Sequence, residues 1–98
     1  MISKSRVILA MNQSMITNIG KNFRMICVDW DDKSFKIRVY SECEPEPEDY
    51  DLVSVILTEV ETYLELLNFE MEIVNSTLAM NKLDPLKLIV FARHEGDI

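Results

Sequence analysis

The sequence predicts an α+β fold in which two helices pack on one face of a four-stranded, mostly antiparallel sheet. First, apolar residues at helical spacing and residues that alternate as in strands follow one another in the order helix, strand, strand, twice over, with a period of about 46 residues. Second, each predicted helix and strand has an apolar side, so the two kinds of element can cover each other. Third, 98 residues, 48% of them hydrophobic, suffice for one core but not for two, which predicts a single domain over residues 1–98.

The first helix is expected within residues 5–19. Its predicted buried face is formed by apolar residues at spacings of three and four: Ile8, Met11, Met15 and Ile19. Gly20 is expected to end this helix, because glycine adopts the left-handed backbone conformation that often closes a helix.

A β-hairpin is expected next, with strands near residues 23–28 and 35–40 and a polar turn at residues 31–34. Alternation of side chains predicts that one face of the hairpin is buried. In the first strand, one face is predicted to carry Phe23, Met25 and Cys27. The second strand would place on its less buried face Lys36, Arg38 and Tyr40.

A strongly acidic connection follows the hairpin. Pro45 and Pro47 predict an irregular, conformationally restricted loop. Six carboxylates occupy ten residues of it: Glu42, Glu44, Glu46, Glu48, Asp49 and Asp51. A helix is expected to begin directly afterwards, with Asn68 as a left-handed terminator. Its apolar stripe is predicted to be Leu52, Val53, Ile56, Val60, Tyr63, Leu64 and Leu67.

The remaining residues predict two more strands. Residues 69–73 alternate and form the third strand, and a loop over residues 75–85 follows. Residues 86–93 are apolar on both faces, which is typical of a central or covered strand. Residues 94–97 are expected to form a frayed tail.

The charge of the chain indicates the class of its partner. The net charge is −7, yet residues 1–28 contain four bases and no acid, so the rest of the chain carries 17 acids against 6 bases. Such a surface repels nucleic acid and anionic lipid and attracts cationic proteins. Solubility is the alternative reason for the acidic charge. We therefore expect a basic protein partner, no nucleic acid and no membrane.

No export or anchoring segment is predicted. The longest apolar run near the start of the chain, residues 7–11, is far shorter than the roughly 20 residues that cross a bilayer. Cys27 and Cys43 have neither Cys-x-x-Cys spacing nor neighbouring histidines, so both are expected to be free thiols. These features predict a cytoplasmic protein.

Catalytic motifs are absent from the sequence. The single histidine, His94, lies near the tail, and the two glycines, Gly20 and Gly96, form no phosphate-binding loop. We expect neither an enzyme nor a bound cofactor.

The hairpin turn offers a weak alternative of metal binding. Its residues Asp29, Trp30, Asp31 and Asp32 resemble a cation loop but lack the turn glycine and distal glutamate of an EF-hand. A polar turn is favoured, and a metal-dependent hydrolase using the three aspartates remains an alternative. Trp30 is expected either to close the core or to anchor a partner.

The acidic connection is therefore the predicted partner-binding region, with the hairpin turn as a secondary candidate. Six solvated carboxylates on a restricted loop suit an electrostatic contact better than acid catalysis, which needs an isolated carboxyl group. The two acidic regions should lie about 25 Å apart, at opposite ends of the second strand. Reversing the charge of Glu46, Glu48 and Asp49 is expected to slow association with a basic partner.

Several short motifs, in order along nearly the whole chain, carry a family resemblance: Asn22-Phe23-Arg24, the Asp-Lys hairpin ending in Tyr40, Pro47-Glu48-Asp49-Tyr50-Asp51, Thr58-Glu59, Pro85-Leu86 and Val90-Phe91-x-Arg93. Together they resemble small bacterial immunity proteins linked to contact-dependent growth inhibition systems. The resemblance implies a cytoplasmic protein that binds the toxic domain of a cognate effector, often a nuclease, and blocks its active site or substrate groove. An acidic protein suits the basic groove of a nuclease.

Besides the metal-dependent hydrolase, two function classes therefore follow from the sequence. The first is an immunity protein, a monomer until it binds a basic nuclease toxin. The second is a homodimeric structural or regulatory module that pairs through a sheet edge or an apolar patch and has no toxin partner.

Overall fold

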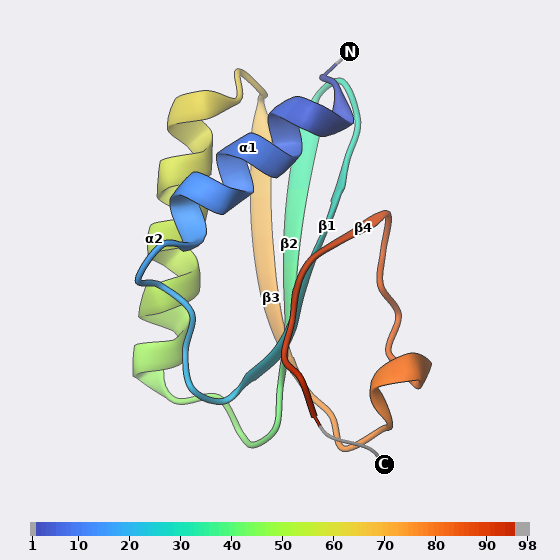
Figure 1. The fold of residues 1–98 in the computed structure, drawn as a ribbon. Coiled ribbons are helices and arrows are strands. Elements are labelled where there is room, and N and C mark those ends of the chain that lie inside the picture. The colour runs from blue at the N-terminus through green and yellow to red at the C-terminus, as the bar shows by residue number, and fades with distance from the viewer. Residues whose placement is uncertain (1, 96–98) are drawn as a thin grey trace.

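The computed structural model describes residues 2–95 and confirms the predicted α+β fold and its element order (Figure 1). The first half contains α1 (Lys4–Met15), β1 (Phe23–Trp30) and β2 (Ser34–Ser41). The second half contains α2 (Pro47–Tyr63), β3 (Asn68–Asn75), a short 3-10 helix (Met80–Lys82) and β4 (Leu88–Ala92). Within the described residues, no helix is long and apolar enough to cross a membrane.

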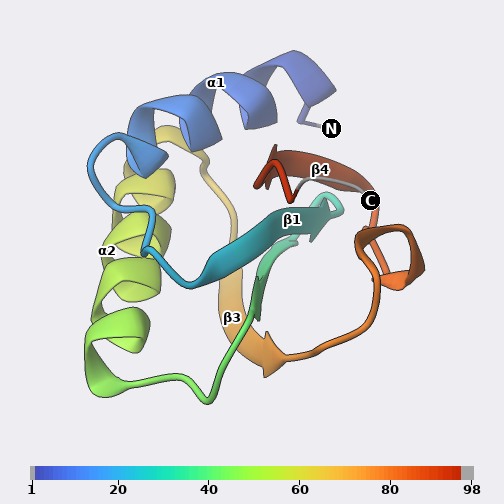
Figure 2. The same cartoon turned by 60° about the horizontal axis from the view of Figure 1, so that its bottom comes forward.

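The four strands form one sheet in the order β3-β2-β1-β4. Strand β1 pairs antiparallel with both β2 and β4, whereas β2 and β3 are parallel. Both helices lie on the same side of the sheet, and the connection that carries the 3-10 helix lies on the other side (Figure 2). Of the two alternatives predicted for the final strand, the central one is wrong, because among the described strands β4 pairs only with β1 and lies at the edge of the sheet.

Helix α1 is shorter than predicted and rotated relative to the predicted face. Ser3 Oγ accepts a hydrogen bond from the backbone N–H of Arg6 and caps the start of the helix. The helix ends at Met15 rather than at Gly20, and Thr17 takes the left-handed conformation with φ 66°. The buried face consists of Val7, Ala10, Met11, Ser14 and Met15. A serine can be buried there because its hydroxyl donates to the carbonyl of Ala10 at 2.8 Å, whereas the predicted Ile8 and Ile19 are partly exposed.

Strands β1 and β2 form the predicted hairpin. However, β1 is buried on both faces, so the prediction that one face of the hairpin is buried was wrong. The pairing of β1 with β2 shifts between Phe23 and Met25, which turns Phe23 to the helix side, away from Met25 and Cys27. On the side away from the helices, a second apolar cluster forms from Met25, Cys27, Tyr40 and Leu83. Burial raises the pKa of the Cys27 thiol to about 11.

Tyr40 belongs to this second cluster and is buried, contrary to the prediction for its face of β2. Its hydroxyl donates to the carbonyl of Asp84 at 3.0 Å, and Arg38 Nη1 lies 3.2 Å from Asp84 Oδ2. These contacts hold the connection between β3 and β4 against the sheet. Residues beyond the alternating strands thus bury the second face.

The end of α2 also differs from the prediction. The helix ends at Tyr63, and Leu64 caps it through its backbone N–H, which donates to the carbonyl of Val60 at 3.0 Å. Asn68 is not a terminator but the first residue of β3, and its N–H donates to the carbonyl of Lys33. Leu64 is 1% exposed, whereas Leu67 is 80% exposed. The predicted apolar stripe therefore continues three residues too far.

The described part of the C-terminal segment is held by charge rather than frayed. Glu95 accepts two hydrogen bonds from the nearly buried guanidinium of Arg24, both at 2.8 Å, and a third from Arg93 at 2.9 Å. The hydrogen bonds from Arg24 are the main cause that lowers the pKa of Glu95 to about 2. Residues 96 and 97 of the predicted tail lie outside the described residues.

Candidate partner-binding surface

The predicted acidic loop is largely the start of a helix. Pro47 is the first residue of α2, so Glu48, Asp49 and Asp51 are helical, which corrects the loop prediction. Proline is favoured at this position, because the first turn of a helix leaves its N–H groups without helical partners in any case. The same unpaired amide groups favour carboxylates in the first turn.

Asp49 uses its carboxylate within the protein. The backbone N–H of Glu46 donates to Asp49 Oδ2 at 2.8 Å, and the N–H of Asp49 donates to the carbonyl of Glu46 at 2.9 Å. This reciprocal arrangement closes the start of α2. Asp49 is only 7% exposed, so its main contribution is to the helix cap.

Glu42 is likewise engaged within the protein. It forms an ion pair with Arg93, and the hydrogen bond that it accepts is the main reason why the pKa of Arg93 is raised. The carboxylate is still accessible at its outer side, because the side chain is 47% exposed. Much of its charge, however, is balanced by the arginine.

The other predicted carboxylates of this cluster face solvent. Glu44, Glu46, Glu48 and Asp51 are exposed, and within the described residues none of them forms a salt bridge. We call these four residues the acidic end. Their charges are therefore available to a partner.

The sequence prediction missed that the acidic end belongs to a long stretch of the chain without basic residues. Between Arg38 and Lys82 the sequence contains eleven acids and no Lys, Arg or His. Helix α2 lies wholly within this stretch. The signal was present in the sequence, but it requires counting the missing bases as well as the clustered acids.

A hollow of about 350 Å³ lies between the connection from α1 to β1 and the start of α2. Ile19 and Leu52 give it apolar lining, Glu46 and Glu48 supply carboxylates, and Lys21 contributes one cation. Apolar walls beside carboxylates suit the alkyl stem and charged head of a lysine or arginine side chain. The sequence prediction named the carboxylates but not the residues of the connection that face them.

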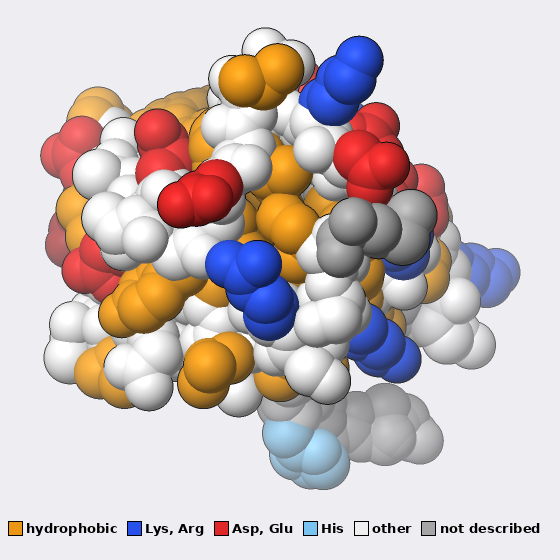
Figure 3. Space-filling model, turned by 90° about the horizontal axis from the view of Figure 1, so that it is seen from above, with side chains coloured by type: hydrophobic (Ala, Val, Ile, Leu, Met, Phe, Trp, Pro, Cys, Tyr) orange, Lys and Arg blue, Asp and Glu red, His pale blue; other side chains and the backbone are white. Residues whose placement is uncertain are grey.

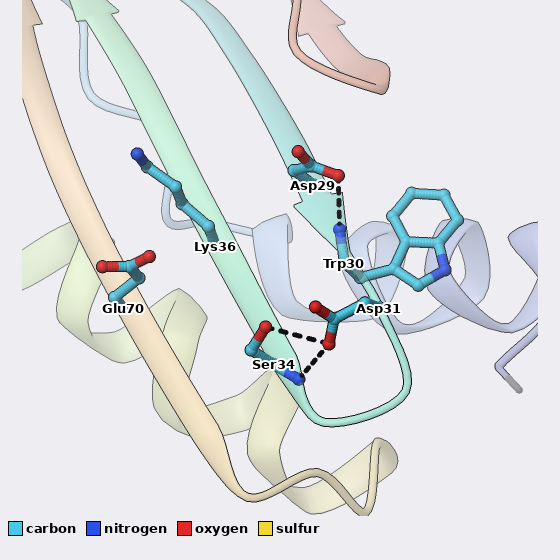
Figure 4. Close-up of a pocket in the computed structure, with 6 residues that line it drawn as sticks. All are labelled: Asp29, Trp30, Asp31, Ser34, Lys36 and Glu70. Carbon is cyan, nitrogen blue, oxygen red and sulfur yellow. Dashed lines mark hydrogen bonds between the residues drawn. The ribbon is translucent and has the colours of Figure 1, made fainter.

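In the hairpin turn, which is the secondary candidate, the carboxylates of Asp29 and Asp31 accept hydrogen bonds from the turn itself (Figure 4). Asp31 Oδ1 accepts from the N–H groups of Lys33 and Ser34, both at 2.8 Å, and from Ser34 Oγ at 3.0 Å. The hydrogen bond from Lys33 is the largest cause that lowers the pKa of Asp31. Asp29 Oδ1 accepts from the N–H of Trp30 at 2.8 Å. These bonds are those of a polar turn.

Trp30 closes one end of the main core. It is 8% exposed, and its indole N–H donates to the carbonyl of Ile2 at 3.2 Å. Lys87 Nζ lies 4.2 Å from the ring centroid and donates to the carbonyl of Trp30 at 2.7 Å. The ring is therefore occupied on the inside by the core and on the outside by a lysine.

A second hollow, of about 220 Å³, borders the hairpin turn. Asp29, Asp31 and Glu70 line it from three different segments, and Figure 4 shows their carboxylates spread around it rather than gathered at one point. Among residues 2–95, no group of three or more His, Cys, Asp or Glu side chains could hold a metal ion.

Acidic side chains extend beyond the acidic end. Figure 3 looks onto the opposite end of the molecule, where acidic side chains gather over α2 and again near the β1–β2 turn, with hydrophobic side chains between them. In the sequence, the second half of α2 and the segment after it supply Glu59, Glu61 and Glu65. The two predicted acidic regions lie at opposite ends of β2.

Comparison with protein families gives a match over nearly the whole chain. Residues 4–95 match the family model described as MafI2 immunity protein, a range that includes every helix and strand of the structure. No curated protein matches the chain.

Proposed function

The chain belongs to the MafI2 immunity protein family and so has a toxin-neutralising role, and we propose that it performs this role by placing the acidic end against a basic surface of its cognate toxin domain. The observation that carries the proposal is the set of exposed carboxylates at and just before the start of α2, none of which forms a salt bridge with another described residue. Contacts made by such groups speed association and select partners of opposite charge.

The proposed contact has a physical advantage over a flexible acidic tail. The cap made by Asp49 and Glu46 fixes the first turn of α2, so Glu48 and Asp51 project from a rigid element. Binding a partner then costs less side-chain and backbone entropy than ordering a loop. The hollow beside Ile19 and Leu52 gives one cationic side chain of the toxin a place to insert.

The proposed toxin is a nuclease. Enzymes that act on nucleic acid present cationic grooves to phosphates, and a rigid row of carboxylates can occupy such a groove in place of the phosphates. The proposal further places the protein in the cytoplasm as a monomer that forms a one-to-one complex with a toxin delivered by contact between cells. Occlusion of the substrate groove is the proposed mode of inhibition.

Neutralisation can be tested with the purified chain and its cognate toxin domain. We expect a one-to-one complex by light scattering, loss of the toxin's nuclease activity at equal molar ratio, and survival of cells that produce both proteins. Binding should weaken steeply as salt rises, because exposed charges are screened within about 10 Å at 0.1 M salt. A toxin that stays active beside a molar excess of the chain would contradict the proposal.

A further inference from the structure

The two edge strands of the sheet differ in how their open sides are protected. Strand β4 has five residues, its pairing with β1 shifts between Ile26 and Cys27, and Lys87 and Arg93 flank it. Short length, bulges and flanking cations are the usual means by which proteins keep other strands from pairing with an edge. Strand β3 has eight residues, pairs with β2 without any register shift, and contains no Lys, Arg, Pro or Gly.

The backbone of β3 presents alternate residues to solvent. The N–H of Asn68 donates to the carbonyl of Lys33 at 3.0 Å, and the N–H of Ser76 donates to the carbonyl of Ser41 at 3.1 Å. In a parallel pair alternate residues bond to the neighbouring strand, so the even-numbered residues of β3 face β2. The N–H and C=O groups of residues 69, 71 and 73 therefore point to the open side, where no hydrogen bond from other described residues reaches them.

Side-chain exposure shows that the sheet becomes more open to solvent from β2 to β3. Phe35, Ile37 and Val39 of β2 are 1%, 0% and 0% exposed. Their neighbours on β3 (Phe69, Met71 and Ile73) pack against the same core but are only half-buried. Helix α2 lies beside β3 on the helix side of the sheet (Figure 2), and every side chain of β3 is still at least partly exposed.

The negative charge of β3 favours pairing with a strand that carries cationic side chains. On the face away from the helices, Glu72 pairs with Lys36 and Arg38, whereas the exposed Glu70 has no salt bridge within the described residues. A second copy, paired antiparallel about Met71, would place its own Glu72 opposite Glu70, and like charges at such positions are destabilising. A strand with cationic side chains on that face avoids this repulsion and gains an ion pair.

We propose that the open edge of β3 accepts an extended segment of the toxin domain, which adds a fifth strand to the sheet and places a Lys or Arg over Glu70. Asn75, the last residue of β3, is paired with Ser41, which directly precedes Glu42, so this edge reaches the same end of the molecule as the acidic end. One toxin domain can therefore contact both surfaces. The inference rests on the proposed function for the identity of the partner.

Amide hydrogen exchange of the chain, alone and with its cognate toxin domain, tests this inference. We expect exchange at Phe69, Met71 and Ile73 to slow roughly tenfold or more in the complex, while the amides of Glu70 and Glu72, already bonded to β2, change less. Glu70→Lys should weaken binding by roughly fivefold, whereas the matched charge reversal Glu61→Lys on α2 should not.

Three results would overturn the inference, and they separate it from the proposed function. A complex in which residues 69, 71 and 73 exchange as in the free chain would exclude strand addition while leaving neutralisation intact. Absence of any complex would exclude both. If these residues already exchange slowly in the chain alone, and exchange more slowly still at higher protein concentration, then the edge pairs with a second copy of the chain.

Discussion

Charge reversal of Glu44, Glu48 and Asp51 to lysine is expected to slow association with the toxin domain by about 10- to 100-fold at low salt, with a much smaller effect on the dissociation rate. These three residues are exposed members of the acidic end and form no salt bridge with any of residues 2–95. Asp49 is left unchanged because it caps α2, and Glu42 because it pairs with Arg93. Stopped-flow mixing at several salt concentrations measures the association rate.

The matched control is the triple reversal of Glu59, Glu61 and Glu65, which changes the net charge by the same amount at the other end of α2. Equal slowing by both triple variants would mean that total charge, rather than the acidic end, attracts the toxin. Melting temperatures of both variants check that the fold is kept, since a lysine in the first helical turn costs only about 0.3 to 1 kcal/mol.

Leu64→Ala is expected to destabilise the protein by about 2 to 5 kcal/mol, because it deletes a buried side chain and leaves a cavity in the main core. For a domain of this size, the melting temperature should fall by roughly 10 to 30 °C. Leu67→Ala should change stability by less than about 0.5 kcal/mol, because that side chain is 80% exposed. Thermal melts followed by circular dichroism compare the two variants.

The two substitutions remove the same atoms from residues only three positions apart. Helical periodicity alone places both leucines on the buried stripe, whereas in the structure the helix ends before either of them. The Leu67→Ala variant keeps the backbone hydrogen bond from residue 67 to Lys33. Equal destabilisation by both substitutions would show that the helix continues as the sequence pattern predicted.

The element order could be predicted because it depends on local patterns. The strand alternation around Phe35 and Phe69 is strong, and it placed both strands correctly. The depth of burial could not be predicted in the same way. Tyr40 is buried because Leu83 and Asp84 return from far along the chain, and a contact across that separation leaves no periodic signal near Tyr40.

Helix ends and pairing partners were predicted less well for a related reason. Just after the end of α1, Thr17 adopts the left-handed conformation that was predicted for Gly20. Threonine rarely adopts this conformation, so glycine was the more obvious candidate. The apolar composition of β4 suggested a central or covered strand. It is an edge strand whose apolar side chains Leu88, Val90 and Phe91 pack at the margin of the main core.

For the candidate site, the sequence located the carboxylates but not their individual states. Asp49 and Glu42 were indistinguishable from Glu44 and Glu48 until the structure showed a helix cap and an ion pair. The helix start was hidden by Pro47, which is compatible with both a loop and a first helical turn. The hollow beside Ile19 depends on two segments that are distant in the sequence.

A crystal structure of the chain bound to its toxin domain tests the central claim most directly. We expect cationic side chains of the toxin within about 4 Å of the carboxylates of Glu44, Glu48 or Asp51, with the toxin's substrate groove covered. A complex in which these carboxylates face bulk solvent while the toxin docks on an uncharged surface would contradict it.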